Sequence, residues 1–294
     1  MCIRDSLMRK VKIITDSTSD LNAELHARYD LTVIPLNVQL GNDSYRDGVD
    51  INPSMISDYV AKTKILPKTS APSVLEYENL FRKPLEEDMD VVFIGIGSKM
   101  SAAYMSAKLA AENVDPTRIH VVDSLNLSTG TGLLVCKAGD MMLAGLPAKE
   151  IAENITALAP KVRASFVVDT LDYLYMGGRC TSLENIAAGI LKLRPRIVVT
   201  DGQAVSAQKY RGKFEKCLDG YIKDTVAEMT NFDKTRVFVT RAITQDPALG
   251  EADSQKAVEE VKKTSPEEIL QTNAGCVIFS HCGPRTIGIL YIDN

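Results

Sequence analysis

Residues 11–20 read VKIITDSTSD, an apolar run that passes directly into six residues bearing hydroxyl or carboxyl groups. The apolar part, residues 11–15, has the length and the β-branched content of a buried strand. A polar loop follows it, and residues 22–29 have a helical pattern. This order predicts a parallel α/β sheet, in which the loops after the strands gather at the carboxyl edge and bind ligands.

The same alternation continues through the first half of the chain. Apolar runs predict further strands at residues 31–39, 91–96 and 119–122. Helical patterns lie between them at residues 73–82, 101–113 and 127–144. We therefore expect residues 8–160 to form an N-terminal α/β domain with a mostly parallel sheet and helices on both of its faces.

The second half mixes hairpins with helices. Asp201-Gly202 joins two apolar runs, 196–200 and 204–210, as the turn of a predicted hairpin. Further strands are predicted at residues 164–168, 236–240, 276–280 and 286–292. Helices are predicted at residues 183–191, 214–229 and 253–264, with a short one ending at Gly177-Gly178. The expected fold is thus two-domain α/β, in which residues 161–294 form an α+β domain with a mixed or antiparallel sheet.

Composition narrows the function classes. Lys and Arg number 34 and Asp and Glu 38, and the resulting net charge of -4 argues against broad nucleic-acid binding. Six scattered cysteines without C-x-x-C spacing, and three histidines, argue against a metal site and for a reducing cytoplasm. The apolar runs are strand-sized, so no stable membrane insertion is expected. Residues 1–7 are interpreted as a non-native extension before a start at Met8.

Hydroxyl groups recur where predicted strands meet helices, and each has a capping alternative. Ser73 with Glu76 fits a capping box, which leaves Thr69 and Ser70 free to face a ligand. Arg179 follows the Gly177-Gly178 helix end, either as an anion partner or as a surface residue. His281 precedes a Gly-Pro turn, where a purely structural role is also open. No P-loop, G-x-G-x-x-G after the first strand, or G-x-S-x-G is present.

Four motifs in order resemble the DegV family of bacterial fatty-acid-binding proteins over residues 8–294. They are DSTSDL at 16–21, TSAPS at 69–73, DTL at 169–171 running to GGR at 177–179, and HCGP at 281–284. The resemblance implies a long-chain fatty acid held between two α/β domains. It implies a non-enzymatic binding subunit without a cofactor, whose bound acid a separate ATP-binding kinase subunit phosphorylates for phospholipid synthesis. The implied carboxylate-binding residues are Thr69, Ser70, Ser98, Ser101, Arg179 and His281.

Two departures from the family pattern stand near these residues. Ala102 and Ala103 replace a Gly-Thr pair, which removes one hydroxyl, and Arg285 replaces a glycine and is expected to add a cation beside His281. The stretches 171–176 and 186–193 are candidate tunnel walls, although a core role is also open. Two alternatives to a carrier are kept: an enzyme that uses the hydroxyl loops on a small phosphorylated or keto substrate, and an interaction module whose lipid is structural.

Overall fold

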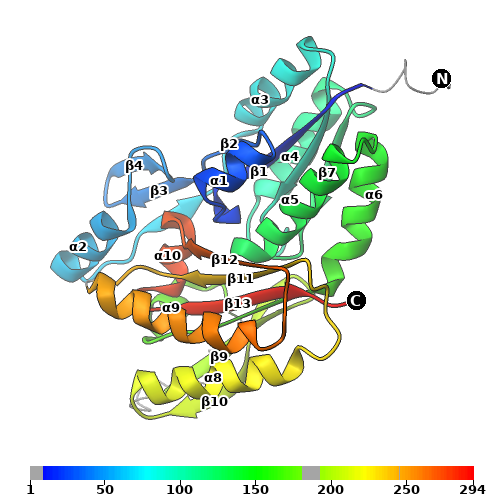
Figure 1. Ribbon diagram of the computed structural model, residues 1–294. Coiled ribbons are helices and arrows are strands. Elements are labelled where there is room, and N and C mark those ends of the chain that lie inside the picture. The colour runs from blue at the N-terminus through cyan, green and yellow to red at the C-terminus, as the bar shows by residue number, and fades with distance from the viewer. Residues whose placement is uncertain (1–8, 181–192, 245) are drawn as a thin grey trace.

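The computed structural model describes residues 9–180, 193–244 and 246–294 (Figure 1). The extension inferred at residues 1–7 and the helix predicted at 183–191 lie outside these ranges, as does nearly all of the candidate tunnel wall at 186–193. Within the described residues the strands form a four-stranded, a six-stranded and a three-stranded sheet.

The four-stranded sheet is parallel, with the order β2-β1-β6-β7. Its strands are β1 (Val11–Asp16), β2 (Thr32–Ile34), β6 (Asp90–Gly95) and β7 (Ile119–Asp123). Side chains alternate between the faces, so that Ile14 and Phe93 pack on one side and Ile13 and Val92 on the other. The first side is covered by α3 (Val74–Glu86) and α4 (Ala103–Val114), the second by α5 (Ser128–Leu143) and α6 (Ala148–Leu158). The predicted parallel sheet with helices on both faces is confirmed.

The six-stranded sheet is mixed, with the order β10-β9-β8-β13-β11-β12. Its strands are β8 (Val162–Val167), β9 (Leu193–Thr200), β10 (Gln203–Arg211), β11 (Arg236–Arg241), β12 (Glu268–Asn273) and β13 (Ile287–Ile292). Only the β11–β12 pair is parallel among these neighbours. The predicted hairpin is present, since Asp201 and Gly202 take the positive φ angles of a two-residue turn, 51° and 75°. Two helices, α8 (Phe214–Glu228) and α9 (Pro247–Lys262), cover one face.

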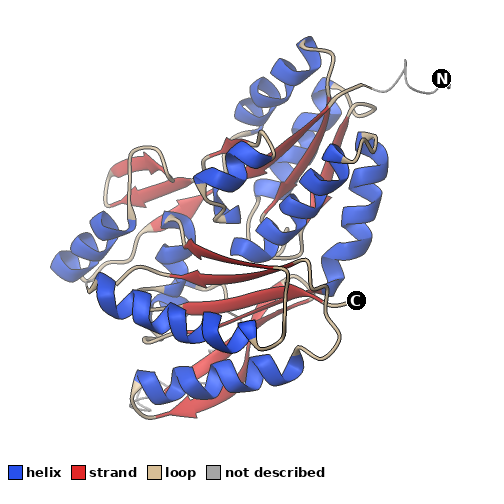
Figure 2. Cartoon of the chain, viewed as in Figure 1, coloured by secondary structure: helices blue, strands red, loops and turns tan. Residues whose placement is uncertain are grey.

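Helix α5 lies between the two large sheets. It contacts β1 and β6 on one side and β8, β11 and β13 on the other. Nearly all of its residues from Ser128 to Gly139 are buried, as expected for a helix with apolar neighbours all round. Figure 2 shows the resulting stack, with the second sheet between the upper helices and α8 and α9. The predicted boundary at residue 160 separates the strands of these two sheets, whereas one hydrophobic cluster includes residues of both.

A small antiparallel sheet, which sequence reasoning did not predict, has the order β4-β3-β5. It contains β3 (Asn37–Leu40), β4 (Asp43–Arg46) and β5 (Lys68–Ser70), and α2 (Pro53–Thr63) joins β4 to β5. The single strand predicted at 31–39 is wrong, because Pro35 divides it into β2 and β3. Proline has no N–H for a sheet ladder, so the chain leaves one sheet there and enters another.

The strand predicted at 276–280 is also wrong. These residues belong to helix α10 (Cys276–Cys282), which begins after Gly275 and ends at Gly283. A short apolar run fits a buried strand and a buried helix equally well, so the pattern alone could not decide. The helix packs on α7 (Asp172–Gly177), and the rings of Tyr173 and Phe279 meet edge to face with their centroids 6.0 Å apart.

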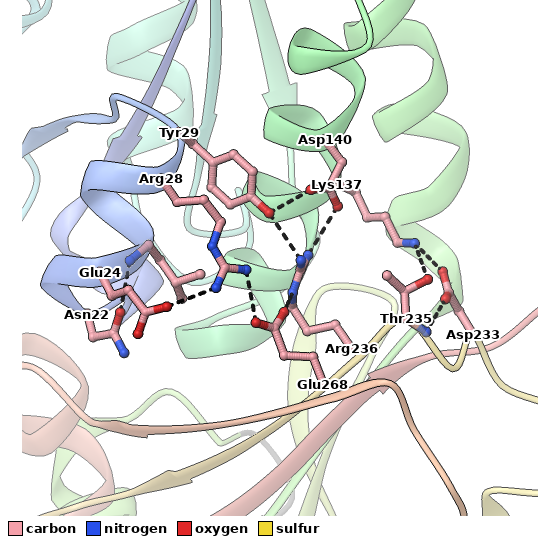
Figure 3. A network of polar contacts seen from close by, with 11 residues as sticks. Asn22, Glu24, Arg28, Tyr29, Lys137, Asp140, Asp233, Thr235, Arg236 and Glu268 are labelled. Atoms are coloured by element: carbon pink, nitrogen blue, oxygen red, sulfur yellow. Dashed lines mark hydrogen bonds and ion pairs between the residues drawn. The ribbon is translucent and has the colours of Figure 1, made fainter.

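A network of polar side chains ties α1 (Ala23–Arg28) and α5 to the second sheet (Figure 3). Arg236 of β11 donates from Nη1 to Asp140 Oδ2 at 3.2 Å and from Nε to Glu268 Oε2 at 2.7 Å. Its Nη2 donates to the Tyr29 hydroxyl at 3.1 Å, and Arg28 also pairs with Glu268 at 2.9 Å. This network fixes the position of the parallel sheet relative to the mixed sheet.

Candidate functional site

The loops that follow β1, β6 and β7 are bonded to one another at the carboxyl edge of the parallel sheet, as the sequence predicted. Asp16 Oδ2 accepts the Ile96 N–H at 2.8 Å. Asp123 Oδ1 accepts the Ser98 N–H and the Leu125 N–H, both at 3.0 Å. These side chains hold the ends of three strands together, so the edge forms one continuous surface.

His281 and Thr69 come together although they are far apart in sequence. His281 lies in the last turn of α10, and its Nε2 is 2.8 Å from Thr69 Oγ1 of β5. Thr69 is half-buried, and its strand is held in register by β3, where Val38 pairs with Thr69. The close approach of α7 to the imidazole requires a glycine, because a Cβ on Gly177 would lie 2.7 Å from His281 Nδ1. The ring is thus fixed from two sides.

Burial keeps His281 uncharged. Desolvation, together with the nearby Arg179 guanidinium, lowers its pKa to about 4. At neutral pH the ring is therefore neutral, with one nitrogen toward Thr69. The other nitrogen, Nδ1, is buried and has no hydrogen-bond partner among the described residues. If Nε2 carries the proton and donates to Thr69 Oγ1, the threonine hydroxyl is left to donate to a ligand.

A cavity of about 290 Å³, called here the hydroxyl cavity, opens beside this pair. Its polar lining comprises Thr69, Ser70, Ser101, Arg179 and His281. Its apolar lining comprises Leu36, Ala71, Ile96, Met100, Ala102, Leu127, Val277 and Ile278. Five of the six residues predicted to bind a carboxylate therefore line one cavity. The sixth, Ser98, is not among its lining residues.

Arg179 supplies the positive charge of the hydroxyl cavity. It follows Gly178, whose φ of 66° gives the left-handed helix cap that the sequence predicted. Its side chain is exposed and donates from Nη1 to the Gly177 carbonyl at 2.8 Å. No carboxylate in the described part of the chain lies within ion-pair distance of it. A guanidinium at a cavity rim without an acidic partner is suited to an anionic ligand.

A second cavity, called here the sheet cavity, lies between α10, α7 and the inner face of the mixed sheet. It shares Leu127, Arg179, Ile278 and His281 with the hydroxyl cavity, so the two adjoin. Its apolar lining includes Phe166, Leu174, Ala204, Ala242, Ala274, Cys282 and Leu290. Its volume is only about 60 Å³, so a larger ligand must displace side chains that now fill the space.

Sequence reasoning missed most of this apolar lining. Of the stretch 171–176, Leu174 lines the sheet cavity, whereas Tyr175 and Met176 are exposed. Residues such as Phe166 and Leu290 lie on β8 and β13, where every alternate side chain is apolar. No sequence signal separates a cavity-lining residue from a core residue on such strands.

The departures at Ala102, Ala103 and Arg285 have different consequences. Helix α4 begins without a side-chain cap at Ala102, and Ser101 Oγ instead accepts the Ala103 N–H at 3.2 Å. The expectation that Arg285 adds a cation beside His281 is wrong, because its side chain has other partners. It pairs with Asp253 at 2.7 Å and lies over the Phe214 ring at 4.5 Å. It does so in a left-handed conformation, with φ of 56°.

A family model matches residues 10–294, that is, nearly the whole chain, and its description is an uncharacterised protein of the DegV family. The chain belongs to the DegV family. A DegV domain-containing protein of Caldanaerobacter subterraneus is 32% identical over 98% of this chain and all of its own length. No helix among the described residues is long and apolar enough to cross a bilayer.

Solved structures of DegV relatives share this fold. A fatty-acid-binding DegV family protein from Thermus thermophilus superposes with a TM-score of 0.86 at 30% identity, covering 97% of this chain and 100% of its own. A stearic-acid-binding protein from Eubacterium ventriosum superposes with a TM-score of 0.83 at 29% identity, covering 96% and 98%. Both cover the two large sheets together, so the relation concerns the whole architecture.

Proposed function

We propose that this DegV protein binds a long-chain fatty acid, with the carboxylate in the hydroxyl cavity and the acyl chain in the sheet cavity. The observation that carries the proposal is the junction of the two cavities at Arg179 and His281. One side of that junction offers hydroxyls and a guanidinium, and the other offers apolar side chains on the mixed sheet. Relatives of matching fold that bind fatty acids support the same assignment.

The two ends of the ligand contribute differently. A tail of about sixteen carbons gains on the order of 10 kcal/mol gross at ~0.8 kcal/mol per CH₂, before the cost of association. The carboxylate contributes less affinity than the tail, and it is very costly to bury without hydrogen bonds. Thr69, Ser70 and Ser101 would donate those bonds, and Arg179 would balance the charge. Ser98 is kept among the proposed carboxylate-binding residues only because it lies three positions before Ser101 in the same loop.

The proposal extends to presentation of the bound acid to a partner. Thr69, backed by the neutral His281, would hold the carboxylate by hydrogen bonding and leave one oxygen accessible at the rim. A separate ATP-binding kinase subunit would then transfer the terminal phosphoryl group to that oxygen, forming an acyl phosphate for phospholipid synthesis. On this proposal the chain acts in the cytoplasm, in keeping with its scattered cysteines without C-x-x-C spacing, and carries no catalytic residue.

The first experiment identifies the ligand. Organic extraction of the purified protein, followed by mass spectrometry, should release an acid of roughly fourteen to eighteen carbons, since each buried CH₂ group adds ~0.8 kcal/mol and a long tail is needed for stable binding. Delipidated protein should bind palmitate at least tenfold more tightly than palmityl alcohol, because the alcohol lacks the charge that Arg179 balances. Binding of a small phosphorylated compound in place of palmitate would instead favour the enzyme alternative and sink the carrier proposal.

The second experiment tests presentation. Palmitate-loaded protein is incubated with a kinase subunit and ATP, and acyl phosphate is trapped as the hydroxamate. Arg179→Ala should lower the rate of product formation more than it lowers palmitate affinity, since Arg179 lies at the head and not along the tail. The matched control is Arg163→Ala, whose parent side chain pairs with Asp293 at 2.7 Å away from the cavities. Equal rates for Arg179→Ala and the parent would contradict the role of Arg179.

A further inference from the structure

Helix α10 contributes residues to the site, but it is too short to be stable without contacts from the rest of the chain. It has only seven residues, Cys276–Cys282, and a helix of two turns is not stable on its own. Three of its residues, Val277, Ile278 and His281, line the hydroxyl cavity. It comes from the C-terminal part of the chain, yet it packs against η2 (Ser17–Ser19), α2, β3 and β5 of the N-terminal part (Figure 1). Its position is therefore set by contacts across the two halves.

Two buried carboxyl groups from the N-terminal half hold the first turn of α10. Asp20 Oδ1 accepts the Gly275 N–H at 2.8 Å. Asp47 accepts the Cys276 N–H at 2.8 Å and the Val277 N–H at 3.3 Å. These are N–H groups that a helix start leaves without partners, and negative charge is favoured there. The helix thus receives its caps from two distant loops and not from its own sequence.

Burying these two carboxyl groups costs free energy, which indicates that their hydrogen bonds to α10 are functionally important. Asp20 and Asp47 are 7% and 3% exposed, and desolvation raises the pKa of both carboxyl groups. The neighbouring carboxyl groups of Asp47 and Asp16 raise the pKa of Asp20 further. No group of three acidic, histidine or cysteine side chains in the described chain is arranged to hold a metal ion. Their oxygens accept backbone N–H groups at the start of α10 and, at Asp20, also the Ser128 hydroxyl at 2.5 Å. Removal of one carboxyl group leaves an N–H buried and unpaired.

The other end of the same helix is sensitive to small displacements. Seven residues span about 10 Å, so a tilt at the first turn is carried to the last. The His281–Thr69 contact is 2.8 Å long, and lengthening it by less than ~1 Å would end the hydrogen bond. The ring also lies so close to α7 that a Cβ at Gly177 would be 2.7 Å from Nδ1.

We propose that Asp20 and Asp47 are positioning residues for the fatty-acid head group: they hold the N-terminus of α10 so that His281, at its far end, meets Thr69. This inference rests on the proposed function for its ligand readout. It adds that the loops after β1 and β4 determine the geometry of a site that they do not touch.

A double-mutant cycle tests whether Asp47 acts through His281. Palmitate affinity is measured for the parent, Asp47→Asn, His281→Ala and the double variant. Asp47→Asn keeps the shape but replaces one acceptor by a donor facing the Val277 N–H. It should raise Kd about tenfold, the equivalent of one lost hydrogen bond at ~1.4 kcal/mol, in the parent background. In the His281→Ala background the effect should fall below about twofold. An undiminished effect there would overturn the proposal.

A readout without ligand separates this inference from the proposed function. The chain has three histidines, so the His281 ring signals can be assigned by single replacements and titrated by NMR. In the parent the ring pKa should lie well below 6.5, and in Asp47→Asn and Asp20→Asn it should rise toward that value as water reaches the ring. An unchanged His281 titration in both variants would refute positioning. A parent that binds no palmitate would refute only the function.

Controls address loss of stability. Asp246 caps α9 with bonds to the Ala248 and Leu249 N–H groups, on the opposite face of the mixed sheet. Asp246→Ala should destabilise the fold and leave the His281 signals and Kd unchanged; a shift of those signals would count against a local effect. If Asp47→Asn does not fold, Gly275→Ala replaces it, since its Cβ would lie 3.1 Å from Asp20 Oδ1. It should shift the His281 pKa in the same direction by a smaller amount, and no shift would overturn the proposal.

Discussion

A neutral imidazole behind a threonine hydroxyl is the central feature of the site at the residue scale. Because burial lowers the pKa of His281 to about 4, the ring does not pair its charge with a carboxylate at neutral pH. Its Nε2 instead lies 2.8 Å from the Thr69 hydroxyl, which lines the hydroxyl cavity. Arg179, exposed at the rim, supplies the charge. His281 thus acts on the Thr69 hydroxyl, whereas Arg179 would balance the charge of the ligand.

Replacement of Thr69 by valine removes only the hydroxyl and keeps the β-branched shape that suits β5. We expect palmitate to dissociate about ten to a hundred times faster, because a bond to a charged group contributes ~1.5–3 kcal/mol. Stopped-flow release of a fluorescent fatty acid measures the rate. Thr264→Val is the control, since its hydroxyl bonds the Val261 carbonyl at the end of α9. An unchanged rate for Thr69→Val would remove Thr69 from the site.

His281 also predicts a pH dependence of stability. Its pKa in the folded protein, about 4, lies below the ordinary value of 6.5, so the unfolded chain binds more protons between these values. The stabilising contribution of the neutral ring is complete above pH 6.5 and is lost as pH falls toward 4. Asp16, Asp20 and Asp47 titrate with raised pKa values and act in the opposite sense.

The comparison with His281→Gln isolates this effect, because the three carboxyl groups remain in both proteins. Urea unfolding at several pH values should show the parent losing stability relative to the variant as pH falls from 6.5 to 4. Above pH 7 the difference between the two proteins should be constant. A difference that stays constant across the whole range would mean that His281 is not buried neutral.

Five of the six residues predicted to bind a carboxylate come together in the structure, and their binding role stays a prediction. Thr69, Ser70, Ser101, Arg179 and His281 line one cavity, and the motifs that named them also named the family. Ser98 does not line this cavity, and its backbone N–H donates to Asp123 Oδ1. The sequence cannot show whether a hydroxyl or its own N–H faces the ligand.

At the scale of elements, prediction failed where distant groups decide the local structure. Helix α10 was predicted as a strand because its own residues carry no N-cap signal; its caps, Asp20 and Asp47, lie more than two hundred residues away. The long runs of β1, β6 and β7 were predicted correctly, since their structure follows from local apolar pattern. The three-stranded sheet was missed because its strands are short and half-exposed.

The end of α7 offers a matched pair of glycine replacements. In Gly177→Ala the added Cβ would lie 2.7 Å from His281 Nδ1 and must displace the ring, whereas at Gly178 nothing lies within 4 Å. Gly178 has a φ of 66°, so Gly178→Ala should cost about 1–2 kcal/mol of stability through backbone strain alone. We expect Gly177→Ala to weaken palmitate binding at least tenfold, which corresponds to ~1.4 kcal/mol, and Gly178→Ala to change it less than twofold. Isothermal titration calorimetry measures both affinities. The reverse ranking would show that strain in the turn, and not the ring position, controls the site.

At the scale of the whole molecule, the two large sheets are joined by α5 and by side chains that no local pattern connects. Gly139 of α5 lies so close to Tyr29 that a Cβ would sit 2.3 Å from its ring. Tyr29 in turn donates to Asp140 at 2.6 Å, and Arg236 reaches both from the second sheet (Figure 3). The class of each sheet was readable from the sequence, but their mutual placement depends on contacts between residues about a hundred or two hundred positions apart.

Arg236 is the residue on which this placement depends most, because its side chain is 5% exposed and bonds Tyr29, Asp140 and Glu268. Replacement by methionine keeps the length but leaves Asp140 without its cationic partner and Glu268 with Arg28 alone. We expect a loss of roughly 2–4 kcal/mol in the free energy of unfolding, somewhat below the range for fully buried pairs, since Asp140 and Glu268 remain partly hydrated. Arg163→Met, which breaks the exposed pair with Asp293, should cost less than about 1 kcal/mol. Guanidinium unfolding at neutral pH measures both. If the two variants lose the same stability, the network in Figure 3 does not hold the sheets together, and the packing of α5 alone must do so.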